Sequence, residues 1–298
     1  AWFAHAAAAV GLPNGAVNIL CGLGQDAGAA LSAHPGVNQI VFTGSVPTGV
    51  AIATAAARNV VPCVLELGGK SAAIVHDDAD LAAFETDMRW GIFFNAGQVC
   101  SAMSRVIVHD SVHDELVDRM VNVATALSVK PGIEQPAFGP TMGAMVSEAQ
   151  CDRAAKMVAD AAAQNAVVAT GGRRLNIPGA FLEPTILTDV TPDMTIAHEE
   201  VFGPVLSVLK FSTDEEAIRI ANGTPYGLVG GVFTRDLDRA TQAARQLRAG
   251  QVFVNEWYAG GVETPFGGYG KSGYGREKGR EALWNYVQTK NVAIRLNG

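Results

Sequence analysis

Gln39-Ile40-Val41-Phe42-Thr43-Gly44-Ser45 is an apolar run that breaks into a glycine and a hydroxyl, and a helical pattern over residues 47–58 follows it. A second apolar run, residues 60–65, comes next and leads into Glu66. A strand, a glycine turn, a helix and a strand in this order are typical of a doubly wound sheet that binds a dinucleotide. The sequence therefore predicts an α/β fold that includes part of a Rossmann-like dinucleotide-binding domain.

The turn at Thr43-Gly44-Ser45 falls where the helix begins. Free N–H groups and the dipole at a helix N-terminus favour an anion, and a glycine lets the backbone approach that anion closely. The full G-x-G-x-x-G fingerprint is absent, so the signal for phosphate binding is weaker than that motif would give. A plain helix-capping turn is the alternative interpretation, and both stay open on the sequence alone.

The alternation of strand and helix continues on both sides of this unit. Before it, we expect a helix over residues 1–10, a strand over 16–20 and a helix over 27–33. After it, we expect strands or extended segments over residues 72–75, 105–109, 167–170, 181–187, 207–211, 229–233, 250–255 and 292–296. We also expect helices between these strands. A helix starts near residue 78 and an amphipathic helix runs through residues 90–100. Further helices cover residues 112–127, 147–165, 215–222 and 237–248.

Val64-Leu65-Glu66-Leu67-Gly68-Gly69-Lys70-Ser71 places one carboxylate in an apolar strand that ends on two glycines. Burial without a partner would raise the pKa of Glu66 toward neutrality, which is how enzymes make a carboxylate into a general base. The alternative is a glutamate at a strand end that pairs with Lys70 or faces water. The motif alone favours neither interpretation.

Gly91-Ile92-Phe93-Phe94-Asn95-Ala96-Gly97-Gln98-Val99-Cys100-Ser101 leads an apolar helical approach into a glycine turn that presents one cysteine. Backbone N–H groups in such a loop can point at the sulfur, so we expect Cys100 to be a nucleophile whose thiol pKa is lowered. The alternative is a buried, inert cysteine, which is the commoner environment of a free cysteine. Asn95, Gly97 and Gln98 do not suit a core helix or strand, and this favours the nucleophile.

Composition limits the class of protein. The 298 residues are 48% hydrophobic and 17% charged, which is typical of a globular protein of one or two domains. A net charge of −7 argues against nucleic acid as a partner. With no membrane-length apolar run and no signal-like leader, we expect a soluble, cytoplasmic protein. The four cysteines lack a C-x-x-C pair and the six histidines lack metal-ligand spacing, so we expect neither disulfides nor a metal.

The Glu66 and Cys100 segments lie 34 positions apart, and together they resemble the active-site patterns of the NAD(P)-dependent, non-acylating aldehyde dehydrogenase superfamily. The resemblance implies that residues 1–68 complete a dinucleotide-binding domain and that residues 69–270 form the catalytic domain. Residues 271–298 would be a return segment with a C-terminal oligomerisation strand. Ala1 is no initiator and residues 1–10 read as the middle of a helix, so we expect the family's N-terminal segment to be missing.

The resemblance also implies roles for single residues. Cys100 would be the nucleophile, and Glu66 would be the base that activates water. The cofactor would be NAD, with NADP possible, and the residues implied to bind it are Gly44, Ser45, Gly49, Leu67, Glu200 and Phe202.

Two further segments supply parts of the implied site. In His198-Glu199-Glu200-Val201-Phe202, Glu200 would hold the nicotinamide ribose and Phe202 would pack near the ring. The alternative for such an acidic pair is a solvated face. Trp257 and Phe266 would line the substrate mouth.

The resemblance implies oxidation of a small-molecule aldehyde to a carboxylic acid through a cysteine thiohemiacetal and thioester, in a homodimer or homotetramer. One alternative is a catalytically silent, truncated scaffold. Another is a cysteine-dependent acyl hydrolase or transferase, which needs a histidine beside the thiol. Neither the Glu66 segment nor the Cys100 segment contains a histidine, and the expected fold places none nearby.

Overall fold

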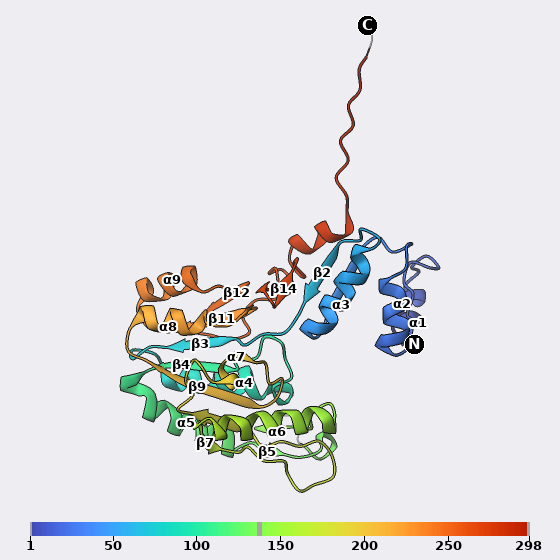
Figure 1. Cartoon of the computed structure of the whole chain (residues 1–298). Coiled ribbons are helices and arrows are strands. Elements are labelled where there is room, and N and C mark those ends of the chain that lie inside the picture. Colours follow the sequence, from blue (N-terminus) through green and yellow to red (C-terminus); the bar gives the residue numbers. More distant parts are fainter. Residues whose placement is uncertain (1, 136–138, 297–298) are drawn as a thin grey trace.

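The computed structural model describes residues 2–135 and 139–296, and its strands form two main sheets with helices packed against them (Figure 1). This confirms the α/β class. The described helices are α1 (Trp2–Ala9), α2 (Ala29–Ser32), α3 (Val46–Ala57), α4 (Leu81–Phe93), α5 (His113–Thr125), α6 (Glu148–Ala163), α7 (Thr195–His198), α8 (Asp214–Ala221) and α9 (Leu237–Gln246). The strands of the two sheets are β1 (Ile40–Thr43), β2 (Cys63–Glu66), β3 (Ala72–Val75), β4 (Arg105–His109), β7 (Val167–Thr170), β8 (Thr185–Thr188), β9 (Val205–Phe211), β11 (Val229–Phe233), β12 (Gln251–Val254) and β14 (Gly273–Tyr274). Two minor ladders pair β5 (Ser128–Val129) with β6 (Thr141–Met142) and β10 (Tyr226–Gly227) with β13 (Tyr269–Gly270).

The smaller sheet has the order β1-β2-β14, with β1 parallel to β2 and β14 antiparallel to β2. α3 connects β1 to β2 and packs against both strands (Figure 1). Ser45 is the N-cap of α3, because its Oγ accepts a hydrogen bond from the N–H of Thr48 at 3.4 Å. The strand, turn, helix and strand predicted from residues 39–66 are therefore present.

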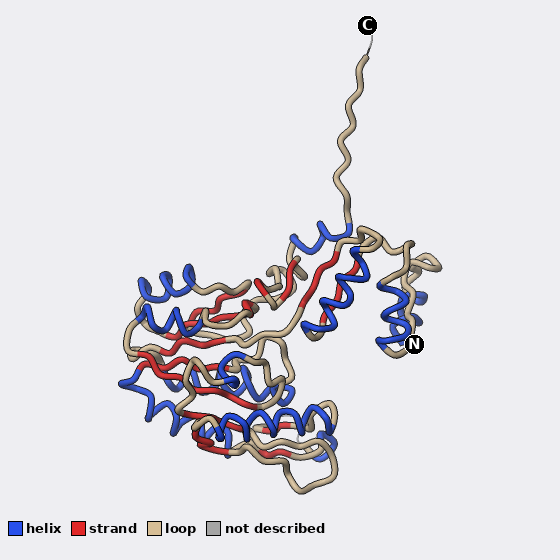
Figure 2. The backbone as a smooth tube through the Cα atoms, viewed as in Figure 1, coloured by secondary structure: helices blue, strands red, loops and turns tan. Residues whose placement is uncertain are grey.

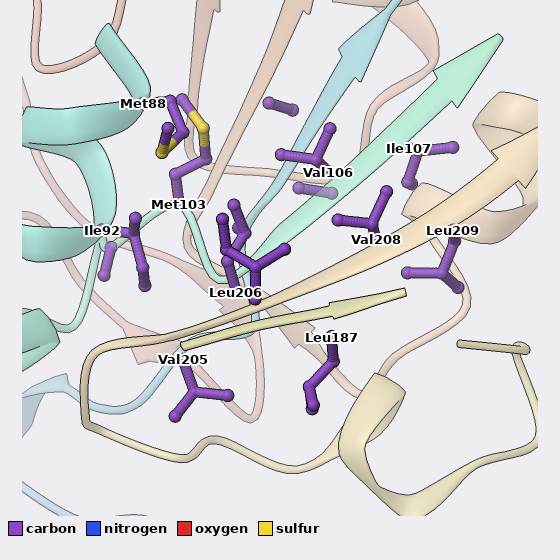
Figure 3. Close-up of a cluster of buried hydrophobic side chains, with 14 of the residues drawn as sticks. Met88, Ile92, Met103, Val106, Ile107, Leu187, Val205, Leu206, Val208 and Leu209 are labelled. Atoms are coloured by element: carbon purple, nitrogen blue, oxygen red, sulfur yellow. The ribbon is translucent and has the colours of Figure 1, made fainter. Parts of the chain in front are cut away.

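The larger sheet has the order β12-β11-β3-β4-β9-β8-β7, and every neighbouring pair is parallel except β7 with β8. Its central strands are buried on both faces, which explains why they read as continuous apolar runs. Figure 3 shows side chains of α4 facing those of β4 and β9. The labelled core residues are Met88, Ile92, Met103, Val106, Ile107, Leu187, Val205, Leu206, Val208 and Leu209.

Residues 67–71 cross from the end of β2 in the small sheet to the start of β3 in the large one. The buried guanidinium of Arg105 holds this crossing. Its Nε donates to the carbonyl of Lys70 at 2.9 Å, and its two other nitrogens donate to the last two carbonyls of α8. The expected domain boundary at residue 68 falls in this crossing, and the division into three parts stays a prediction.

Three expectations about secondary structure are wrong. Residues 16–20 are exposed and form no strand, because no described segment pairs with them. The helix expected to reach residue 100 ends at Phe93, where the backbone leaves helical geometry. Residues 287–296, which include the expected strand 292–296, form no strand and run away from the body as an extended tail (Figure 2). Their role in oligomerisation stays a prediction.

Candidate active site

A cleft of about 990 Å³ lies where the two sheets meet. This volume is at the upper end of the roughly 300–1,000 Å³ range of small-molecule sites, so the cleft has room for a large ligand. Most of the residues implied by the sequence resemblance line it, namely Gly44, Ser45, Glu66, Leu67, Cys100, Glu200 and Phe202.

The loop that presents Cys100, residues 94–101, is called the cysteine loop below. Residues 95–97 all have positive φ, at 51°, 53° and 70°. Only glycine fits at position 97, because a Cβ there would overlap the backbone that follows α7. The Nδ2 of Asn95 donates to the carbonyl of Gln98 at 3.1 Å, and the Nε2 of Gln98 donates to the carbonyl of Asn95 at 3.0 Å. Asn95 and Gln98, whose polar side chains do not suit a core helix or strand, therefore hold this turn together by hydrogen bonds.

The thiol of Cys100 is half-buried in the cleft wall. Its pKa is raised to about 11, mainly by burial and also by the carboxylates of Glu200 and Glu66. The backbone N–H groups of Ser101 and Cys100 act in the opposite direction. The expected lowering of the thiol pKa is therefore wrong: N–H groups do point at the sulfur, but burial and two acids outweigh them. Near pH 7 the thiol is protonated, so attack on a substrate requires a proton acceptor.

Glu66 is 2% exposed, and within the described residues neither of its carboxylate oxygens has a hydrogen-bond partner. The pKa of Glu66 is raised to about 8, mainly by burial and also by Glu277, while Arg276 opposes the rise. A Cβ on Gly267 would lie 2.7 Å from Oε1, so the backbone at Gly267 packs directly on this carboxylate. The interpretation of Glu66 as paired with Lys70 or facing water is therefore wrong. The amine of Lys70 is itself buried without a described partner, and burial lowers its pKa to about 7.

The Glu66 segment and the cysteine loop touch at Gly69. A Cβ at Gly69 would lie 2.6 Å from the carbonyl oxygen of Cys100, so this approach requires glycine. The N–H of Gly69 donates to Oε1 of Glu200 at 3.0 Å. Three segments distant in sequence thus converge on one backbone position. The solvated-face interpretation fits the exposed Glu199 but not Glu200, which is half-buried and whose pKa is raised by burial.

The remaining cofactor residues lie around α3. A Cβ on Gly49 would lie 2.6 Å from Cδ2 of Leu67, so α3 packs closely on that leucine. Gly49 does not line the cleft itself. Ser45 caps α3 and also lines the cleft, which confirms the capping interpretation and leaves its contact with a phosphate as a prediction.

Two residues that sequence analysis missed hold the segment with Glu200 and Phe202. The Nε2 of Gln150 donates to the carbonyls of Val201 and Phe202, both at 2.9 Å. Arg153 donates to the carbonyls of Glu200 and Val201 at 3.0 and 3.1 Å. Both side chains project from α6, three positions apart on one face. Polar residues on a helix face are common, so the local sequence carried no signal for this role.

Trp257 and Phe266 do not line this cleft within the described residues. Trp257 is 6% exposed and lies behind the cysteine loop. Phe266 is half-buried and pairs through its backbone with Glu277. Their contact with a substrate stays a prediction. His198 does line the cleft, although it is not among the groups that shift the pKa of the Cys100 thiol.

Comparison with known proteins gives the class of this one. The model of the aldehyde dehydrogenase family matches residues 1–292. The chain is 46% identical over 285 residues to the peroxisomal aminoaldehyde dehydrogenase 1 of Pisum sativum, covering 95% of this chain and 56% of that protein. It is 43% identical over 288 residues to the chloroplastic betaine aldehyde dehydrogenase of Atriplex hortensis, again covering 95% and 56%. The structure of betaine aldehyde dehydrogenase from Staphylococcus aureus in complex with NAD+ superposes with a TM-score of 0.89 at 37% identity, covering 94% and 55%. The chain belongs to the aldehyde dehydrogenase family.

The chain spans about 56% of the length of the curated relatives named here. The names of these relatives place them in the peroxisome and the chloroplast, so the expected cytoplasmic location stays a prediction. Among residues 2–135 and 139–296, no helix combines the length and apolar character needed to cross a membrane.

Replacing Glu66 by Gln should change how stability depends on pH. The pKa of Glu66 is about 8 in the folded protein and 4.5 in a model peptide, so its contribution to folding is fully present below pH 4.5 and is lost as the pH rises through 8. We expect Glu66→Gln to gain stability over the parent as the pH rises from 5 to 9, by on the order of a few kcal/mol. Urea unfolding of both proteins at pH 5, 7 and 9 measures this, and a difference that is independent of pH would contradict the burial of an unpaired carboxyl.

Proposed function

We propose that this chain carries the catalytic cysteine and the general base of an enzyme that oxidises an aldehyde to a carboxylic acid with NAD(P). One observation carries the proposal: the Cys100 thiol and the unpaired, buried Glu66 line the same cleft, and their segments touch at Gly69. A nucleophile next to a base with a raised pKa is the arrangement that acyl chemistry on a thiol requires. Membership of the aldehyde dehydrogenase family supports the choice of aldehyde as substrate.

The cleft fits a dinucleotide. The N-terminus of α3 at Gly44 and Ser45 offers free N–H groups and a positive dipole end for a pyrophosphate. The carboxylate of Glu200 can accept hydrogen bonds from ribose hydroxyls, and Phe202 gives an apolar wall. We propose NAD as the cofactor, with NADP possible, and the complex of the Staphylococcus aureus relative with NAD+ supports this choice. Bound NAD would supply the acceptor for the aldehyde hydride.

In the proposed reaction, the thiol of Cys100 passes its proton to solvent water or to Glu66, and its sulfur attacks the aldehyde carbon to form a thiohemiacetal. The backbone N–H of Cys100 would hold the oxyanion. After the hydride has left, the carbon is a thioester on Cys100. Glu66 then takes a proton from a water molecule, whose oxygen attacks the thioester carbon, and the C–S bond breaks to release the carboxylic acid.

We propose that this activity belongs to a full-length enzyme that also contains the N-terminal segment implied by the family resemblance. That segment would supply a second oxyanion donor, and removing one such donor costs roughly 10²–10³ in rate. The isolated 298-residue chain would then be inactive. The activity measurements below use the full-length enzyme.

The experiment that tests the function follows both products. The enzyme is mixed with NAD and a panel of aldehydes, NADH is measured by absorbance, and the acid is measured by chromatography. We expect equal amounts of NADH and acid. Acid released from a thioester or ester substrate without NADH would instead support the hydrolase, for which His198 is the candidate partner of the thiol. A folded enzyme that forms neither product would support the silent scaffold.

Glu200→Gln is expected to slow hydride transfer more than it weakens NAD binding. The carboxylate is held by the N–H of Gly69, and from there it would fix the ribose and the ring beyond it. Weakening one charge-assisted hydrogen bond should cost about 1.5–3 kcal/mol, or roughly 10- to 100-fold in rate. Stopped-flow NADH formation in a single turnover measures the step, and a titration of NAD gives its affinity. A normal single-turnover rate would mean that Glu200 has no role in hydride transfer.

A further inference from the structure

The segment that follows β12 contacts the cysteine loop through Trp257, which is buried and is not among the residues that line the cleft. Asn255 and Tyr258 in this segment have positive φ, at 55° and 62°. Such backbone is unfavourable for residues with a side chain and persists only where surrounding contacts enforce it. The side chain of Asn255 exchanges two hydrogen bonds with the backbone of Thr234. Trp257 and Tyr258 donate hydrogen bonds to the carbonyl of Ser101, directly after Cys100, and to the carbonyl of Gly91 in α4.

The indole of Trp257 is fixed tightly. Its Nε1 donates to the carbonyl of Ser101, the residue after the cysteine, at 3.2 Å. A Cβ on Gly231 would lie 2.7 Å from the ring, and the ring of Phe253 meets it edge-on with centroids 5.7 Å apart. Little space is left for the indole to move, so the bond to Ser101 fixes the loop relative to β11 and β12.

The phenol of Tyr258 binds the end of α4, the helix that leads into the loop. Its hydroxyl donates to the carbonyl of Gly91 at 3.2 Å, and the same carbonyl accepts the N–H of Met103 at 2.8 Å. This carbonyl therefore connects the last turn of α4, Met103 just after the loop and the segment that follows β12. Burial raises the pKa of Tyr258 and the Cys100 thiol adds to the rise, so the phenol keeps its proton and stays a donor.

We propose that Trp257 and Tyr258 are positioning residues for the thiol of Cys100, and this inference rests on the proposed function. The N–H groups of Cys100 and Ser101 are the groups that favour the thiolate, and they lie between the two anchored carbonyls. The left-handed turn at residues 95–97 is held by the local bonds between Asn95 and Gln98, whereas the sulfur lies after that turn. Trp257 holds this second half directly at Ser101, and Tyr258 holds it through the carbonyl of Gly91, which also accepts the N–H of Met103.

Removal of either donor should let the N–H groups move away from the sulfur. The thiolate is then less favoured, so the thiol becomes less reactive at a given pH. The variants that remove a donor and keep an aromatic ring are Tyr258→Phe and Trp257→Phe. The matched control is Tyr269→Phe, which removes the hydroxyl of a half-exposed tyrosine on β13.

The test is the pH profile of iodoacetamide alkylation between pH 7 and 10 in the full-length enzyme without aldehyde or NAD. Peptide mass spectrometry gives the rate at Cys100, and the rate at Cys63 serves as an internal reference. We expect each donor variant to react about 3- to 10-fold more slowly at Cys100 throughout this range, which lies below the thiol pKa of about 11, so that its curve of rate against pH is displaced to higher pH. The double variant should be slower still. Tyr269→Phe should match the parent, and Cys63 should react equally in all proteins.

The outcomes separate this inference from the proposed function. If Cys100 reacts in the parent and both single variants give the parent's profile, the positioning role is wrong, even if their melting temperatures fall. If Trp257→Phe does not fold, Tyr258→Phe alone decides the question. A parent in which Cys100 is not alkylated at any pH in the range would contradict the nucleophile, and the inference would fail with it.

Discussion

Cys100→Ala is expected to abolish aldehyde-dependent NADH formation in the full-length enzyme, with a loss of roughly 10⁴- to 10⁶-fold. Without the sulfur no thiohemiacetal can form, and the other residues that line the cleft have no covalent bond to the substrate to act on. The affinity for NAD should stay within a few-fold, because the proposed cofactor contacts come from α3 and Glu200. NADH absorbance measures the rate, and a titration of NAD measures its dissociation constant.

The other three cysteines provide matched controls. Cys21 is exposed, Cys63 is half-buried and Cys151 is buried in the core, and none of them lines the cleft of the described chain. Cys21→Ser, Cys63→Ser and Cys151→Ala should therefore keep the parent's turnover once folding has been verified. Aldehyde oxidation that survives in Cys100→Ala would contradict the assignment of the nucleophile.

Glu66→Gln is expected to separate the two halves of the reaction. Hydride loss needs the thiohemiacetal, whereas release of the acid needs an activated water, so the acyl-enzyme should accumulate. Steady-state turnover should fall by about 10²–10⁴-fold, the usual contribution of a general base. Stopped-flow absorbance should show a burst of one NADH per active site and then a slow phase.

The high pKa of the Cys100 thiol gives this experiment a second use. With the thiol pKa near 11 and that of Glu66 near 8, the carboxylate is a nearby group that could also accept the thiol proton. If Glu66→Gln shows no burst and forms NADH slowly from the first turnover, Glu66 acts before hydride transfer. A normal burst with normal turnover would remove Glu66 from the mechanism altogether.

The sequence predicted those features that depend on local pattern. Alternation of apolar runs with helical segments gave the parallel strands, and most element limits differ from the structure by a few residues. The isolation of Glu66 in an apolar strand left two interpretations open, and the structure favours the raised pKa over the paired or solvated glutamate, because a buried carboxylate without a partner favours its neutral form. The glycine turn predicted before Cys100 is present as the left-handed turn at residues 95–97, although the helix expected to run to residue 100 already ends at Phe93.

Features that depend on distant contacts could not be predicted. The pKa of the Cys100 thiol is raised by burial and by Glu200, which reaches it only because the segment after α7 folds beside Gly69. Nothing around Trp257 in the sequence indicates that its Nε1 bonds the cysteine loop, since the partner is 156 residues away. Residues 292–296 have the alternation of a strand, but a strand forms only where another strand supplies hydrogen bonds.

The central claim is that the aldehyde carbon becomes bound to the sulfur of Cys100, beside the carboxylate of Glu66. The direct measurement is peptide mapping by mass spectrometry of full-length Glu66→Gln quenched seconds after mixing with an aldehyde and NAD. We expect the acyl mass on the peptide that contains Cys100, with occupancy near one per chain, and no adduct when NAD is omitted. An acyl mass on any other residue, or NADH formed without an adduct on Cys100, would contradict the account.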